Sequence, residues 1–208
     1  MGAFLAEVPP RRGRSPEGVH CGPAVSRFAS MEIRRMTTDD LEAVIAIQAR
    51  AHLPEFHESR ESFACKLARA GGTAWMALDE AGRGLGYCLA LVWHSHLPRP
   101  GLDAGQVAAV ERPDCLYLHD LAVLPEAGGQ QVGRRLAGAA CAAAMRLGLR
   151  GILLVSLADS AGWWRRQGWS DQPGRSAPGG YGPGAIVMFR ETDCRSDREK
   201  AGESRLTK

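Results

Sequence analysis

Hydrophobic residues recur at helical spacing near the start of the patterned part of the chain. Between residues 41 and 52 the apolar side chains stand three or four positions apart, as on one face of an amphipathic helix. Thr37 and Asp40 precede this stretch at the spacing of a capping box, which predicts a helix start. A second helix is predicted over residues 59–69, because Gly71 follows it and glycine readily adopts the positive φ of a helix end.

Shorter apolar stretches predict the strands of a sheet. Residues 73–78 and 85–93 flank a turn rich in glycine and charged residues, which is the pattern of a β-hairpin. A long loop over residues 94–113 comes next, and loops of this length in compact domains are often functional. Residues 115–123 then form a third long strand, and residues 185–190 close the sheet.

The second half of the chain predicts one pair of parallel strands. Residues 132–147 form a helix of mostly small side chains that ends before Gly148. Residues 152–157 are continuously apolar, which indicates a strand covered on both faces. Because a strand, a helix and a second strand follow one another, the two strands are expected to pair in parallel. A short helix is predicted over residues 160–167, after the second of these strands.

The regular pattern defines one domain over residues 31–191. Residues 1–30 contain four prolines and no periodic apolar pattern, which is typical of a disordered extension. Met31 opens a strand-like stretch over residues 32–36 that leads directly into the first predicted helix, so it is a candidate for the native initiation site, and a genuine flexible arm is the alternative. Residues 192–208 are charged and aperiodic and are interpreted as a solvated tail.

The composition is that of an ordinary globular protein. Of the 208 residues, 45% are hydrophobic and 24% are charged, and the net charge of +3 attracts polyanions only weakly. No apolar stretch approaches the roughly 20 residues that span a bilayer, and the first residues lack the order of a signal peptide. The six cysteines include no CxxC pair, which favours free thiols in a reducing compartment. We therefore expect a cytoplasmic protein with neither a nucleic-acid nor a membrane partner.

The most informative segment covers residues 118–136, where a strand leads through a glycine-containing loop into a helix. Such a loop presents unpaired main-chain N–H groups at a helix N-terminus, where the helix dipole also favours an anion. A phosphate group would fit there, and a purely structural turn is the alternative. The segment matches neither the phosphate-binding loop of nucleotide triphosphatases nor the glycine fingerprint of dinucleotide-binding folds.

This segment resembles the acetyl-CoA segment of the GNAT N-acetyltransferase superfamily, in which strand, proline, loop and helix follow in the same order. A second stretch, residues 160–169, is similar to the later helix of that family, which ends in an aromatic residue, three further residues, a glycine and another aromatic. The resemblance covers about residues 31–191. It implies an α/β (α+β) fold with a mixed, mostly antiparallel central sheet that is splayed at one parallel pair and flanked by helices, and acetyl-CoA as the acyl donor.

The resemblance also implies which residues meet the donor. The main chain at the end of the strand would meet the pantetheine arm, and the loop with the helix start would bind the diphosphate. The family favours Gln or Arg where this chain has Gly128, and Gly where it has Gln131, which leaves the tightness of binding open. Trp164 stands where the family often has a catalytic Tyr. The cofactor-binding residues implied are Leu121, Ala122, Val123, Gly129, Gln130, Gln131, Val132, Gly133, Arg134 and Trp164.

Direct transfer to an amine needs a base for the ammonium group and a proton donor for the leaving thiolate. His119 is the first candidate for the base, because the ordinary pKa of histidine is near 6.5. Asp120 follows it, and strand alternation predicts that the two side chains point to opposite faces. Tyr117, on the face of His119, and Tyr181, in a glycine-rich loop, are candidate proton donors. Packing in the core is the alternative role for the histidine and for both tyrosines.

The family commonly lines its acceptor pocket with residues between the first two helices, and this places Glu55, His57 and Glu58 among the candidates for contact with the substrate. A solvated polar loop is the alternative. His94 and His96 form an HxH pair, but no carboxylate or cysteine stands nearby at a ligand spacing, so we expect no metal.

The sequence thus predicts an N-acetyltransferase that transfers an acetyl group from acetyl-CoA to a primary amine by direct attack. A non-catalytic acyl-CoA-binding sensor or interaction protein with the same fold is the main alternative, and a nucleotide-binding module is a more distant one. The acceptor is a small-molecule or protein amine, and homodimer formation stays open.

Overall fold

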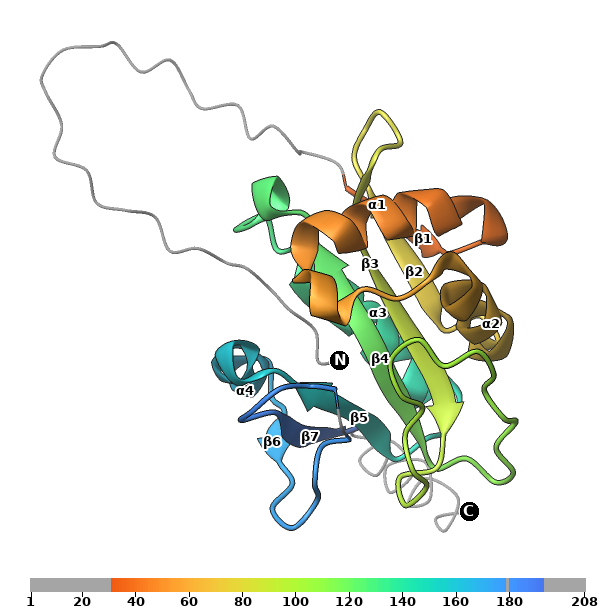
Figure 1. Cartoon of the computed structure of the whole chain (residues 1–208), viewed down its shortest axis with the longest axis vertical. Helices are drawn as coiled ribbons and strands as arrows, with labels where there is room; N and C mark the ends of the chain where they lie inside the picture. The colour runs from red at the N-terminus through yellow and green to blue at the C-terminus, as the bar shows by residue number, and fades with distance from the viewer. Residues whose placement is uncertain (1–30, 179, 193–208) are drawn as a thin grey trace, which may run out of the picture.

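The computed structural model describes residues 31–178 and 180–192 (Figure 1). The predicted extension over residues 1–30 and nearly all of the predicted tail lie outside these residues. None of the described helices is long and apolar enough to cross a membrane. The strands are β1 (Glu32–Arg35), β2 (Ala74–Leu78), β3 (Gly84–Trp93), β4 (Cys115–Val123), β5 (Gly151–Ser156), β6 (Ser170–Asp171) and β7 (Ile186–Glu191). The α-helices are α1 (Leu41–Ala51), α2 (Arg60–Ala70), α3 (Val132–Arg146) and α4 (Ala161–Arg166), with short 3₁₀ turns between elements.

The seven strands form one mixed sheet in the order β1-β2-β3-β4-β5-β7-β6. All neighbouring strands are antiparallel except β4 and β5, which are parallel. Every residue of β4 and β5 is buried, as the continuous apolar pattern of the second strand predicts. The predicted fold class, including its single parallel pair, is therefore confirmed.

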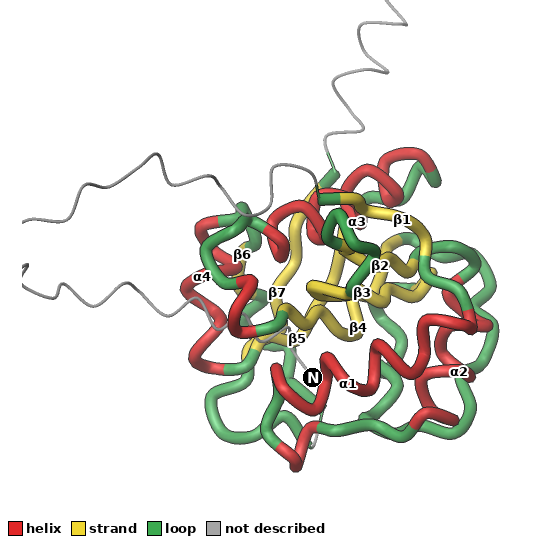
Figure 2. Tube along the Cα trace, turned by 90° about the horizontal axis from the view of Figure 1, so that it is seen from above, coloured by secondary structure: helices red, strands yellow, loops and turns green. Residues whose placement is uncertain are grey.

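Helices cover both faces of the first half of the sheet. Helices α1 and α2 contact each other and lie over β3 on one face, whereas α3 packs against β2, β3, β4 and β5. Figure 2, seen from above, shows α1 and α2 on one side of the strands and α3 on the other. The short helix α4 lies beside β6 and β7 in the second half (Figure 1).

Local sequence signals fix the ends of the first helices. The Asp40 carboxylate accepts hydrogen bonds from the main-chain N–H of Thr37 at 2.8 Å and from its hydroxyl at 3.1 Å, so the predicted start is present. Ser59 caps α2 by accepting a hydrogen bond from the N–H of Ser62. Gly71 ends α2 at a φ of +58°, in the left-handed region that glycine adopts without strain.

The two halves of the sheet separate along the parallel pair. Strand β4 pairs with β5 only from Cys115 opposite Gly151 to Leu118 opposite Leu154, although β4 continues to Val123. Over the described residues, the edge of β4 that faces β5 therefore has no ladder partner from His119 onward. Main-chain groups left unpaired inside a protein need other partners, and this stretch includes the residues predicted to meet the pantetheine arm.

Candidate active site

A β-bulge lies at the point where β4 parts from β5. In the antiparallel ladder with β3, Leu89 pairs with Asp120 and Ala90 pairs with Leu118, so His119 is the extra residue. An inserted residue interrupts the alternation of side chains along a strand. The His119 and Asp120 side chains accordingly both reach toward the connection between α1 and α2, where they contact Glu58 and His52. The expectation that they point to opposite faces was wrong, because it assumed an unbroken strand.

His119 is held by a buried carboxylate. Its Nε2 lies 2.7 Å from Oε1 of Glu58, and the second oxygen of Glu58 accepts hydrogen bonds from the Lys66 ammonium and, at 2.9 Å, from the N–H of Asp103. Glu58 itself is anchored by Gln48, whose side-chain amide bonds both the N–H and the carbonyl of Glu58 at 2.9 Å. The sequence placed Glu58 among the acceptor-pocket residues, whereas in the structure it is the hydrogen-bond partner of the candidate base.

The charges of this cluster determine which tautomer His119 adopts. Burial raises the pKa of the Glu58 carboxyl, but His119 and Lys66 outweigh it and hold the pKa well below its ordinary value. Burial lowers the pKa of His119 and prevails over the attraction of Glu58, so the imidazole is neutral near pH 7. An ionised carboxylate can only accept, so the proton is on Nε2 and the lone pair is on Nδ1. Nδ1 is buried and, among the described residues, has no hydrogen-bond partner.

A second histidine–carboxylate pair lies next to the first. Asp120 accepts a hydrogen bond from His52 Nε2 at 3.0 Å and from the Tyr87 hydroxyl at 2.5 Å. Burial raises the pKa of Asp120, but His52 and Tyr87 bring it below its ordinary value, so the carboxylate is ionised. These contacts occupy both oxygens of Asp120, which positions it as a partner of His52. His52 and Tyr87 were not among the predicted site residues.

The two candidate proton donors lie together. The Tyr117 and Tyr181 hydroxyls are 2.8 Å apart, and the ring of Tyr117 meets that of His119 at a centroid distance of 5.7 Å. Both tyrosines are buried. Burial raises the pKa of Tyr117 strongly, so its phenol stays protonated at neutral pH. Tyr181 belongs to the loop before β7, and the pair therefore bridges the two halves of the splayed sheet.

The start of α3 offers a row of main-chain donors. Within the described part of the chain, the N–H groups of Gln131, Val132, Gly133 and Arg134 bond no acceptor, as is usual for the first turn of a helix. Gln131 has a φ of +62°, which costs a residue with a side chain about 1–2 kcal/mol. Glycine would adopt this conformation without that cost. A Cβ added at Gly129, two residues before the first of these donors, would meet no atom within 4 Å.

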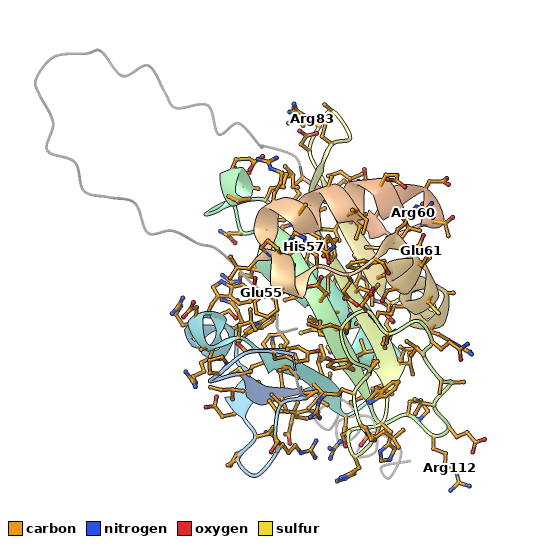
Figure 3. All side chains as sticks on the ribbon, in the orientation of Figure 1. Glu55, His57, Arg60, Glu61, Arg83 and Arg112 are labelled. Carbon is orange, nitrogen blue, oxygen red and sulfur yellow. The ribbon has the colours of Figure 1, made fainter. Side chains whose placement is uncertain are left out.

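The remaining predicted site residues are divided between the core and the surface. Trp164 is fully buried between Trp163 and Trp169, at centroid distances of 4.7 and 4.8 Å, so its position is one of core packing. Glu55 is exposed and His57 is half-buried, with its Nε2 3.0 Å from the carbonyl oxygen of His52. Figure 3 shows both on the connection that passes over β4.

No metal cluster appears in the part of the chain that the structure describes: it contains no group of three or more His, Cys, Asp or Glu residues that could hold an ion. His94 and His96 contact each other through their rings. The described cysteines, Cys65, Cys88, Cys115 and Cys141, are free thiols, as their spacing predicted.

Comparisons with known proteins agree with this geometry. The family model described as "Acetyltransferase (GNAT) family" matches residues 39–169. No curated protein sequence matches the chain significantly.

Solved structures share the fold at low sequence identity. The loading GNATL domain of CurA from Lyngbya majuscula has a TM-score of 0.65 at 13% identity, with 80% of this chain and 100% of that chain covered. The ribosomal-protein-S18-alanine N-acetyltransferase of Escherichia coli has a TM-score of 0.56 at 20% identity, covering 78% and 94%. The PaiA N-acetyltransferase of Thermoplasma acidophilum, solved with coenzyme A, has a TM-score of 0.57 at 15% identity, covering 78% and 99%. By its sequence match and its fold, the chain belongs to the GNAT acetyltransferase family.

Proposed function

We propose that the protein is an N-acetyltransferase that moves an acetyl group from acetyl-CoA to a primary amine by direct attack. Family membership supports an acyl-transferring enzyme. One observation carries the finer proposal: His119 stands in the bulge where β4 leaves β5, with Nε2 on the Glu58 carboxylate and an unpartnered lone pair on Nδ1 among the described residues.

The donor site is assigned to the unpaired edge of β4 and the first turn of α3. Free main-chain groups of Leu121 and Val123 would bond the pantetheine arm, and the N–H groups from Gln131 to Arg134 would bond the diphosphate. Bound acetyl-CoA supplies the activated acetyl group. The exposed Arg134 and Arg135 side chains at the same helix start add positive charge for the phosphates.

His119 accepts the proton of the acceptor amine. Its neutral Nδ1 takes a proton from the ammonium group, while Glu58 stabilises the imidazolium that forms. The free amine then attacks the thioester carbonyl and a carbon–nitrogen bond forms. The carbon–sulfur bond breaks, and the second proton lost by the nitrogen goes to the leaving thiolate, which gives a neutral amide and CoA thiol. Tyr117, whose ring contacts that of His119, is hydrogen-bonded to Tyr181, and one hydroxyl of this pair donates a hydrogen bond to the leaving sulfur while the other donates to its partner. His119 passes its proton on to solvent.

Release of free CoA tests the proposal against its alternative. With the full chain, acetyl-CoA and a panel of amines, the enzyme is expected to liberate CoA thiol in proportion to acetylated product. A non-catalytic acyl-CoA sensor predicts thermal stabilisation by acetyl-CoA without CoA release for any amine. A nucleotide-binding module predicts stabilisation by ATP and none by acetyl-CoA. Detection of the CoA thiol and mass spectrometry of the amine distinguish the enzyme, the acyl-CoA sensor and the nucleotide-binding module.

The pH profile of Glu58→Gln tests the role of Glu58 as a positioning residue. In the native enzyme kcat/KM is expected to fall as His119 becomes protonated, at a pH lower than the ordinary pKa of histidine because burial lowers the pKa of His119. Glu58 raises the pKa of His119, so removing its charge shifts this acidic limb to still lower pH. The plateau rate falls roughly 10- to 100-fold with the loss of one charge-assisted hydrogen bond.

A merely structural role for Glu58 predicts a different result. In that case the folded Glu58→Gln protein loses rate equally at every pH, and the acidic limb stays where it was. Circular dichroism checks folding first, because the substitution leaves the buried Lys66 ammonium without its carboxylate.

A further inference from the structure

Two arginines from different loops lie beside the tyrosine pair. Arg99 belongs to the connection between β3 and β4, and Arg175 to the connection between β6 and β7. Arg99 Nη2 donates to the carbonyl of Ser176 at 2.8 Å, and Arg175 Nη1 donates to the carbonyl of Ser95 at 2.8 Å. Each guanidinium therefore bonds the main chain of the other loop, and the two cations are held on facing loops.

Neither guanidinium has a carboxylate partner within the described residues. Over residues 31–178 and 180–192, the ion pairs include neither Arg99 nor Arg175. In the same ranges, Arg99 Nε is buried and has no hydrogen-bond partner. A buried donor without a partner is unfavourable, and a buried cationic one more so. Arg99 thus keeps one unsatisfied donor, and both guanidiniums are cations without a carboxylate among the described residues.

These cations belong to the candidate active site. Burial raises the pKa of the Tyr117 phenol and the Arg99 charge opposes that rise, so the guanidinium lies within electrostatic range of Tyr117. Burial lowers the pKa of Arg99, Tyr117 opposes this effect, and Arg175 lowers that pKa further. Tyr117 in turn bonds Tyr181 and meets the His119 ring. The Arg99 charge therefore acts on the tyrosine that meets the proposed base, and Arg175 lies on the same connection between β6 and β7 as Tyr181.

The site has opposite charges at its two ends. Glu58 and Asp120 are ionised beside His119, whereas the Arg99 charge acts on Tyr117 and Arg175 faces Arg99 from the other loop. A guanidinium with free N–H groups matches the planar geometry of a carboxylate. A second cation on the acceptor would be repelled at the arginine end.

We infer that the acceptor carries a carboxylate near its amine, with the carboxylate bound by Arg99 and Arg175 while the amine lies at His119. This inference rests on the proposed N-acetyltransferase function. It specifies the acceptor class as amino acids and related zwitterions, in preference to polyamines.

Matched acceptors test the inference in the full-length protein. CoA release is measured with amino acids, with their carboxamides, and with the amines that remain when the carboxylate is removed. The acids are expected to have the highest kcat/KM. Arg99→Gln should raise the KM for the acids about 10- to 100-fold, the effect of losing a charge-assisted contact, and leave the KM for the carboxamides and for acetyl-CoA unchanged.

Arg112→Gln is the matched control. Arg112 lies on the same connection as Arg99 but is exposed and points away from the site (Figure 3). Its substitution should therefore change neither the KM for the acids nor the KM for the carboxamides.

Carboxamides that react as well as the acids would overturn the inference, and so would an Arg99→Gln substitution that raises the KM equally for acids and carboxamides. Activity of Arg99→Gln toward carboxamides shows that the variant is folded. Failure of every amine to release CoA defeats the proposed function itself, which is a distinguishable result.

Discussion

Replacing His119 by Gln is expected to lower kcat/KM at neutral pH by about 10²- to 10⁴-fold, the usual contribution of a general base. The amide nitrogen of Gln can stand close to the position of the imidazole Nε2 and keep the hydrogen bond to Glu58. What the variant loses is the lone pair on Nδ1. Steady-state release of CoA from acidic to mildly alkaline pH measures the loss, and the acidic limb of the profile should disappear with it.

Donor binding separates a chemical defect from a structural one. The affinity of His119→Gln for acetyl-CoA, measured by calorimetry, should match that of the native protein, because the assigned donor contacts are main-chain groups elsewhere. A folded variant that binds acetyl-CoA and retains most of its activity would exclude His119 as the base. His52→Gln would then be the next variant to measure, since His52 has the same kind of carboxylate partner.

Replacing Gly133 by Phe is expected to weaken acyl-CoA binding by about 10³-fold or more. Gly133 is buried in the first turn of α3, amid the free N–H groups assigned to the diphosphate. A large side chain there would keep the phosphates from these donors, and loss of two such charge-assisted hydrogen bonds suffices for an effect of this size. Isothermal calorimetry with acetyl-CoA and with CoA measures the dissociation constants.

Gly138→Phe supplies the control for this substitution. Gly138 lies on the same helix and is exposed, and a Cβ added to it would meet no atom within 4 Å, so its replacement should leave binding intact. Gly133→Ala introduces a smaller side chain, so it should weaken acyl-CoA binding less than Gly133→Phe and disturb folding less. Unchanged affinity in a folded Gly133→Phe protein would mean that the diphosphate lies elsewhere.

The sequence was sufficient for most of the fold because most elements carry their own local signal, whereas the two-residue strand β6 does not. The alternation and length of apolar runs located the hairpin, and the strand–helix–strand order determined the parallel pairing of β4 with β5. Small differences at element ends, such as α3 ending at Arg146, come from caps that a pattern does not resolve.

The site was only partly predictable because its contacts join distant parts of the chain. His119 and Tyr117 could be proposed from their strand, but the bulge that turns His119 toward Glu58 depends on pairing with β3. Glu58 and His119 are 61 positions apart, and His52 and Asp120 are 68 apart. The only sequence signal for His52 is its place at the end of α1, and Tyr87 resembles any aromatic residue of a buried strand.

The short seam between β4 and β5 has a consequence for how the protein responds to its donor. Four residue pairs join the block of strands β1 to β4 to the block of β5, β7 and β6. Beyond Leu118, the main-chain groups on this edge of β4 face no strand among the described residues. A pantetheine chain that bonds these main-chain groups would act as an additional strand of the sheet. Stability would then rise with the concentration of that chain by mass action, so the folded lifetime of the protein would follow the cellular supply of acyl-CoA.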